Sequence, residues 1–119
     1  MTVKQLEANV RTEPGVAIID LYGEINSFAE EGLNSAYSEA DQSQPSIISL
    51  NFVNVDYINS TGIALIVSLL ARARKSRRRM VVYGLSDHYV EIFQITRLSD
   101  FMSIFPDEET ALAEVAARD

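Results

Sequence analysis

Apolar residues recur along the chain in two alternating patterns, short runs rich in Val and Ile and stripes at helical spacing. The runs at residues 16–22, 46–52 and 80–84 are nearly continuous, which is typical of buried strands. Residues 3–11 predict a weaker strand, and the turn-forming residues 12–15 predict a hairpin that leads into the next run. The polar residues that follow Phe52 are expected to form a loop, and a short edge strand is expected at 102–105.

Between these runs, apolar residues recur every three or four positions, which predicts amphipathic helices. Ser27 is predicted to begin the first helix, because with Glu30 it matches a capping box. Residues 59–62 are predicted to begin the second helix, and Ser86 or Asp87 to cap a short third. Asp107 is predicted to cap the last helix. The predicted inward-facing residues are Ala29, Leu33, Ala36, Tyr37 and Ala40 in the first helix, Ile63, Ile66, Val67, Leu70 and Ala73 in the second, Val90, Phe93 and Leu98 in the third, and Leu112 and Val115 in the last.

The predicted order is strand, strand, helix, strand, helix, strand, helix, short strand, helix. Such alternation with short links implies right-handed parallel crossovers and an α/β layered fold. We find no internal repeat, linker or low-complexity segment, so residues 1–119 are predicted to form a single domain.

The composition of the chain excludes several classes of site and partner. The 119 residues are 47% hydrophobic and 23% charged, an ordinary globular balance. The chain has no cysteine and only one histidine, His88, which excludes disulfides, thiolate metal sites and multi-histidine metal centres. The net charge of −7 disfavours binding to nucleic acid. No secretory signal is visible, and the most apolar stretch, 63–71, is too short to span a bilayer, so we expect a cytoplasmic protein without membrane insertion.

Six of the ten basic residues fall within positions 72–79. Cations at the end of the second helix would complement its dipole, which favours a solvated basic face. The alternative is an electrostatic patch for an acidic partner, at a distance of roughly 24 Å from Ser60 if the helix has about sixteen residues.

The element order and four short motifs resemble the STAS family, which is named after sulphate transporters and anti-sigma factor antagonists. Gly23-Glu24-Ile25-Asn26 is similar to the family's Gly-Glu-Leu/Ile-Asp, and residues 55–63, Val-Asp-Tyr-Ile-Asn-Ser-Thr-Gly-Ile, are similar to its Val-x-Phe-Met-Asp-Ser-Ser/Thr-Gly-Leu. Residues 83–86 and 104–112 match two further segments. The resemblance implies the STAS fold, a mixed and mostly parallel sheet of four to five strands with about four helices packed against it.

The resemblance also implies a function, that of the anti-sigma factor antagonists. In such proteins a serine at the position of Ser60 is phosphorylated by an anti-sigma factor, a serine kinase with a histidine-kinase-like ATPase fold, and a PP2C-type phosphatase reverses the step. The unphosphorylated form binds the kinase, and the phosphorylated form is released from it. Thr61 is the alternative acceptor. The implied partner-binding residues are Asn26, Ser27, Tyr57, Ile58, Asn59, Ser60, Thr61 and Gly62. The same resemblance implies a monomer or weak dimer that has no catalytic activity or cofactor of its own.

Two residues depart from the family pattern, because Asn26 and Asn59 stand where the family has aspartates. The amide keeps most of the hydrogen-bonding shape and removes two negative charges. The loss of these charges favours a second hypothesis, a non-phosphorylated STAS adaptor subunit of a transporter or signalling assembly, whereas the retained Ser60-Thr61-Gly62 argues against it. A third hypothesis, a small enzyme or nucleotide-binding protein, is disfavoured because the chain has no phosphate-cradling glycine loop.

Ser60 is predicted to cap the second helix, and capping alone is the simplest interpretation of it. A phosphate at the same place would meet free backbone N–H groups and the positive end of the helix dipole. Its charge of roughly −1.5 to −2 would then act at the surface on a partner. Asp20, within a predicted core strand, suggests no function from the sequence.

Overall fold

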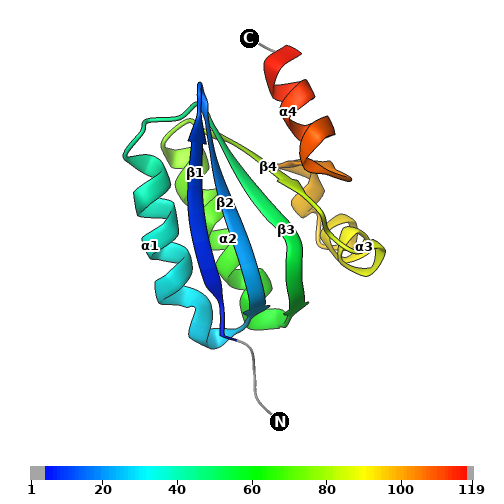
Figure 1. Ribbon diagram of the computed structural model, residues 1–119. Coiled ribbons are helices and arrows are strands. Elements are labelled where there is room, and N and C mark those ends of the chain that lie inside the picture. The colour runs from blue at the N-terminus through cyan, green and yellow to red at the C-terminus, as the bar shows by residue number, and fades with distance from the viewer. Residues whose placement is uncertain (1–4, 118–119) are drawn as a thin grey trace.

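Five strands form one mixed sheet in the computed structural model, which describes residues 5–117 (Figure 1). Their order in the sheet is β1-β2-β3-β4-β5. The β1 strand is antiparallel to β2, and the other neighbours are parallel. The predicted mixed, mostly parallel sheet is thereby confirmed. The strands are β1 Glu7–Glu13, β2 Val16–Ile25, β3 Ile47–Ile58, β4 Arg79–Tyr83 and β5 Ser103–Phe105.

Three helices and two short 3-10 turns connect the strands, and a fourth helix follows β5. They are η1 Ser27–Ala29, α1 Glu30–Asp41, α2 Ser60–Lys75, α3 Asp87–Ile95, η2 Leu98–Asp100 and α4 Glu108–Ala117. Alternate strand residues point to opposite faces of the sheet. Ile19, Leu50 and their neighbours meet α1, α2 and α3 on one face. Ile18 and Val81 meet Val115 of α4 on the other, so α4 covers only one end of the second face (Figure 1).

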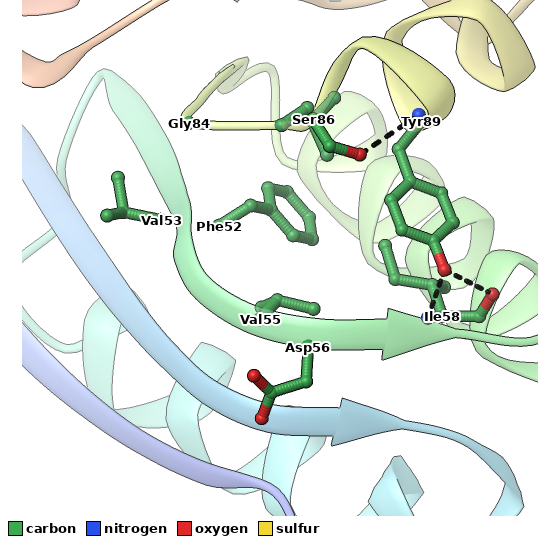
Figure 2. A pocket seen from close by; sticks show the side chains of 9 residues that line it. Phe52, Val53, Val55, Asp56, Ile58, Gly84, Ser86 and Tyr89 are labelled. Carbon is green, nitrogen blue, oxygen red and sulfur yellow. Dashed lines mark hydrogen bonds between the residues drawn. The ribbon is translucent and has the colours of Figure 1, made fainter.

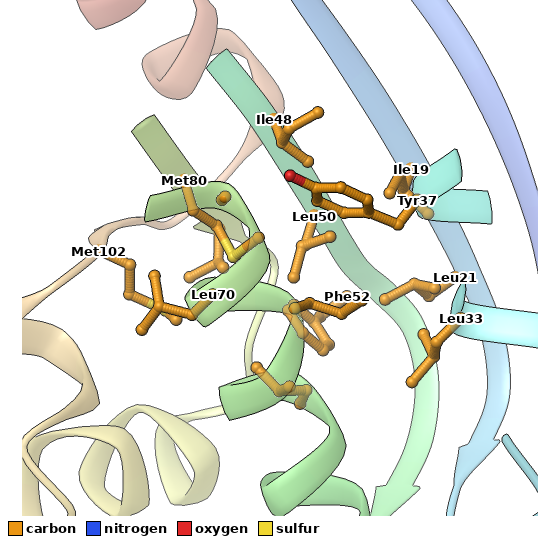
Figure 3. Close-up of a cluster of buried hydrophobic side chains, with 14 of the residues drawn as sticks. Ile19, Leu21, Leu33, Tyr37, Ile48, Leu50, Phe52, Leu70, Met80 and Met102 are labelled. Atoms are coloured by element: carbon orange, nitrogen blue, oxygen red, sulfur yellow. The ribbon is translucent and has the colours of Figure 1, made fainter. Parts of the chain in front are cut away.

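The main core lies between the sheet and the first two helices. Figure 3 shows Tyr37 of α1 and Leu70 of α2 beside Leu50 and Phe52 of β3. The predicted stripe of the first helix is confirmed, since all five of its residues are buried, with Ala29 in η1 and the other four in α1. In α2 one position was predicted wrongly: Val67 is 43% exposed and Leu69 is buried instead. The helix packs on the side that carries Ile66, Leu69, Leu70 and Ala73, and position 67 lies to one side of it.

Several predicted boundaries were wrong. Residues 53–58, expected as a loop, continue β3, and β2 also extends to Ile25. Residues 53–58, Val-Asn-Val-Asp-Tyr-Ile, mix apolar and polar side chains because α4 leaves that part of the sheet open to water on one face. At the N-terminus, β1 begins at Glu7 and runs through Thr12 and Glu13, so the turn shrinks to Pro14 and Gly15, whose φ is +80°. The predicted start at residue 3 lies outside the described residues.

Candidate functional site

The predicted site lies where β2 and β3 end and where η1 and α2 begin (Figure 1). Ile25 of β2 pairs with Ile58 of β3, and the Asn59 N–H then donates to the Ile25 carbonyl at 3.2 Å. The fold therefore brings the 23–26 and 55–63 motifs together at one end of the sheet, as the carboxyl ends of parallel strands require.

Two asparagines cap the turns that start here. The Asn59 Oδ1 accepts a hydrogen bond from the Gly62 N–H at 2.8 Å, and the Asn26 Oδ1 accepts one from the Phe28 N–H at 2.9 Å. The predictions that Ser27 and Ser60 are the N-caps were wrong. Asn59, one residue before Ser60, caps α2, and Asn26, one residue before Ser27, caps η1, whereas α1 begins only after Ala29. The backbone turns from extended to helical at the asparagines, and their side chains reach the free N–H groups.

Ser60 is consequently the first residue of α2 and is not its cap. Its side chain is exposed, and among residues 5–117 its hydroxyl makes no hydrogen bond. Thr61, the alternative acceptor, is also exposed. The capping role that offered the simplest account of Ser60 belongs to Asn59, so the hydroxyl of Ser60 is available for other chemistry.

Gly62 fixes the start of α2 against the sheet. A Cβ atom at this position would lie 2.0 Å from the carbonyl oxygen of Ile25, closer than any side chain can approach. Only glycine permits this contact. Gly62 is buried, as is Ile58 at the end of β3, and both support the surface from below.

The remaining predicted residues reach solvent. Ser27, Tyr57, Ser60 and Thr61 are exposed, and Asn26 and Asn59 are half-buried. The structure adds Phe28, whose side chain is 86% exposed on η1. We call Ser27, Phe28, Tyr57, Ser60 and Thr61 the Ser60 surface. Phe28 was missed, although it falls outside the three- and four-residue spacing of the α1 stripe, which indicates an outward-facing side chain.

The basic run at 72–79 is mostly bound within the fold. The Arg72 guanidinium lies 4.3 Å from the centre of the Tyr37 ring, and Arg78 forms an ion pair with Asp41 at 2.7 Å. Arg79 donates to the Ser103 hydroxyl at 2.6 Å. These contacts support a structural origin for the basic run over a patch for an acidic partner.

A second polar cluster lies on the face of the sheet that α4 partly covers, opposite the main core. We call it the Arg11 network. The Arg11 guanidinium donates to both oxygens of Asp20 at 2.6 and 2.8 Å, and the Asn51 amide donates to Asp20 at 2.8 Å. Arg11 also pairs with Glu108 of α4, and the Tyr83 hydroxyl donates to Glu108 at 2.7 Å. The network ties α4 to four strands and accounts for Asp20, which is 6% exposed.

The carboxyl groups of this network are held in their charged forms. Burial alone would raise the pKa of Asp20, but the hydrogen bonds from Arg11 and Asn51 and the charge of Arg11 outweigh it and lower that pKa. Hydrogen bonds from Arg11 and Tyr83 lower the pKa of Glu108. Burial and the bond to Glu108 raise the pKa of Tyr83.

Comparisons with a family model, with curated proteins and with solved structures all point to the same family. The model of the STAS domain family matches residues 7–111. The anti-sigma-B factor antagonist of Listeria monocytogenes is 28% identical over 88 residues, which cover 72% of this chain and 77% of the relative. An anti-sigma factor antagonist from Mycobacterium paratuberculosis superposes with a TM-score of 0.79 at 19% identity, covering 97% of this chain and 96% of that one. The Bacillus cell fate determinant SpoIIAA in its phosphorylated form gives a TM-score of 0.70 at 22% identity, covering 92% and 99%.

Two further observations bear on the kind of site. Within residues 5–117 no helix is both long enough and apolar enough to cross a membrane. In the same part of the chain, no three His, Cys, Asp or Glu side chains are grouped so that they could hold a metal ion.

Proposed function

The chain belongs to the STAS domain family, and from this premise we propose that it is an anti-sigma factor antagonist that switches between protein partners in the cytoplasm. Its unphosphorylated form binds an anti-sigma factor that is also a serine kinase, and phosphorylation of Ser60 releases it. A PP2C-type phosphatase restores the binding form. The observation that carries this proposal is the exposed hydroxyl of Ser60, which starts α2 and is not used as its cap.

The position of Ser60 suits a phosphate. The first N–H groups of a helix have no partner within the helix, and the positive end of the helix dipole stabilises an anion there. The first turn of α2 has no acidic residue to repel the added charge. Because Asn59 provides the cap, phosphorylation removes no capping hydrogen bond. The phosphorylated SpoIIAA structure, which shares this fold, supports the compatibility of phosphate with the architecture.

The added charge acts on binding through desolvation. Phe28 of η1 and Tyr57 near the end of β3 are 86% and 52% exposed, and they offer apolar area for a partner that covers the end of the sheet where α2 begins. A phosphoserine carries roughly −1.5 to −2 charges, and burying them without a compensating cation would cost the complex several kcal/mol. The unphosphorylated surface therefore binds, and the phosphorylated one does not.

On this account the switch operates at the surface without a change of fold. Amide NMR spectra of the chain with phosphoserine at position 60 should shift around Asn26, Tyr57 and Ser60 and stay unchanged in the Arg11 network. Large shifts at Asp20 or Glu108 would instead show that the phosphate acts through a conformational change.

The proposal is tested by capturing partners from lysate of the source organism with four immobilised variants. Wild type and Ser60→Ala should retain a kinase-like ATPase, and Ser60→Asp should lose it. Ser38→Asp, which adds the same charge on an exposed position of α1 away from the site, should retain it. Mass spectrometry should find phosphate on Ser60 of the endogenous protein. If it finds phosphate on Thr61, the acceptor is Thr61.

A second candidate, the non-switching STAS adaptor, is favoured by one observation. Asn26 and Asn59 lack the family's carboxylates and serve here as neutral caps. The adaptor hypothesis predicts that all four baits retain the same assembly and that Ser60 carries no phosphate. The same capture experiment therefore separates the two functions.

A further inference from the structure

The β3 strand, the longest of the sheet, extends beyond the end of β4 toward the Ser60 surface. The β3 strand pairs with β4 only over residues 47–51, and it then continues along β2 to Ile58. The chain leaves β4 at Tyr83 and enters α3 at Asp87. Because the pairing of β3 with β4 stops at Asn51, a pocket remains between the end of β3 and the start of α3 (Figure 2).

Two contacts hold the walls of this pocket at a fixed separation. Gly84, with a φ of +82°, lies so close to β3 that a Cβ atom there would be 2.4 Å from the Val53 Cγ2. At the other end, the Tyr89 hydroxyl accepts a hydrogen bond from the Ile58 N–H at 2.9 Å and donates to the Ile58 carbonyl at 3.3 Å (Figure 2). The pocket is therefore preformed, and a ligand would not need to open it.

The volume of the pocket restricts its ligand. It measures about 180 Å³. Sites for drug-sized ligands and cofactors take roughly 300–1,000 Å³, so a nucleotide does not fit. An apolar cavity of about 150 Å³ holds a benzene molecule. The space therefore matches one aliphatic or aromatic side chain.

Most of the residues that line the pocket are apolar, as binding of an apolar side chain requires. Phe52, which is 2% exposed, and the half-buried Val55 and Leu85 provide apolar lining. Ser86, which is exposed, adds a polar group, and the Asp56 side chain points away from the cavity (Figure 2). A partly buried apolar pocket is the kind of site that receives an anchor residue in protein interfaces.

We propose that this pocket receives one leucine or phenylalanine side chain of the protein that docks over Ser60. The proposal rests on the proposed function and adds an apolar anchor to it. Ile58 lines the pocket, and Ser60 follows two residues later, so their Cα atoms are separated by at most about 7.5 Å. A partner that covers Ser60 can therefore reach the pocket within the same interface.

The pocket is tested without any partner by titrating isotopically labelled protein with capped amino acids. N-acetyl-leucinamide or N-acetyl-phenylalaninamide should shift amides of residues 52–58 and 84–89, with a dissociation constant on the order of 1–10 mM. N-acetyl-glycinamide, which has no side chain, should not. Shifts that are equal for all three compounds, or that occur elsewhere, would overturn the proposal.

Two variants that fill the pocket provide the matched test. Val55→Phe and Leu85→Phe each place extra volume inside it and should weaken binding of the leucine probe at least about tenfold. Val67→Phe adds the same group on the exposed side of α2 and should leave binding unchanged. Thermal unfolding of each variant identifies those that remain folded, and one folded pocket variant is sufficient.

The captured partner then distinguishes the two proposals. If Ser60→Asp abolishes capture and a folded pocket variant weakens it, both stand. If Ser60→Asp abolishes capture and the folded pocket variants bind as wild type does, the anchor is wrong and the switch remains. If Ser60→Asp has no effect, the switch itself fails, whatever the probes show.

Discussion

The Arg11 network and the Ser60 surface use polar side chains in opposite ways. In the network, Arg11, Asp20 and Glu108 satisfy one another, and their hydrogen bonds join α4 to the sheet. On the Ser60 surface, the polar groups that shape the backbone are the two asparagine caps, and the hydroxyl of Ser60 has no hydrogen bond among residues 5–117. A polar group that is already satisfied holds the fold together, whereas an exposed and uncommitted one can be modified or bound at little cost in stability.

The largest difference between the two regions should appear on removing Asp20. Asp20→Ala leaves Arg11 and the amide of Asn51 without their shared acceptor, and we expect a loss of about 3 kcal/mol in unfolding free energy, measured by urea denaturation. Asp100→Ala breaks an exposed Asp–Arg pair and should cost under about 0.5 kcal/mol. Equal losses in the two variants would remove the structural role of the network.

The glycine that positions the Ser60 surface should come next. Gly62→Ala forces a methyl group against the Ile25 carbonyl, and we expect a loss of about 2 kcal/mol. Gly32→Ala is the control, because it lies in α1 with its nearest contact at an ordinary 3.4 Å and should gain up to about 1 kcal/mol. The opposite signs are the test, and a neutral Gly62→Ala would mean that α2 can move away from β2.

A smaller effect separates the cap, Asn59, from the switch residue, Ser60, at the start of α2. Asn59→Ala should cost about 1 kcal/mol because it removes the acceptor of the Gly62 N–H. Ser60→Ala should change stability by less than about 0.5 kcal/mol and remove the phosphate acceptor. Chemical denaturation of the two variants side by side decides the assignment, which is reversed if the serine variant is the less stable.

The smallest effect should be the pH dependence of the network. Glu108 has a lowered pKa in the folded chain, so it stabilises the fold above the pKa of about 4.3 that it has when unfolded. That contribution is lost as the pH falls through the folded value. The stabilities of Glu108→Gln and wild type should differ by under about 1 kcal/mol near neutral pH and converge in acid, as pH-dependent denaturation would show. Glu109→Gln, an exposed neighbour, should follow the wild type throughout.

Most of the fold could be predicted because its signals are local. The runs at 16–22 and 80–84 identify strands by themselves, and the spacing of Leu33, Ala36 and Ala40 identifies a buried helix face. The end of β3 differs from those runs. Residues 53–58, Val-Asn-Val-Asp-Tyr-Ile, alternate between apolar and polar side chains because one face of the sheet is open there, so they lack the continuous apolar run that identifies residues 46–52 as a strand.

The site was predicted in outline and missed in detail for physical reasons. The 55–63 motif placed Ser60 at the start of α2, but the choice between Asn59 and Ser60 as cap depends on backbone angles one residue apart. The Arg11 network was missed because residues 11, 20, 51, 83 and 108 are far apart in sequence. The pairing of β1 with β2, of β2 with β3 and of β3 with β4 brings the first four together, and the packing of α4 on the sheet adds Glu108.

The most direct test is the affinity of the captured kinase-like partner for two forms of this chain, one unmodified and one with phosphoserine encoded at position 60. We expect the phosphorylated form to bind at least about 100-fold more weakly, because its charge must be buried in the interface. Equal affinity of the two forms would contradict the account and leave Ser60 as an exposed residue of a permanent binding surface.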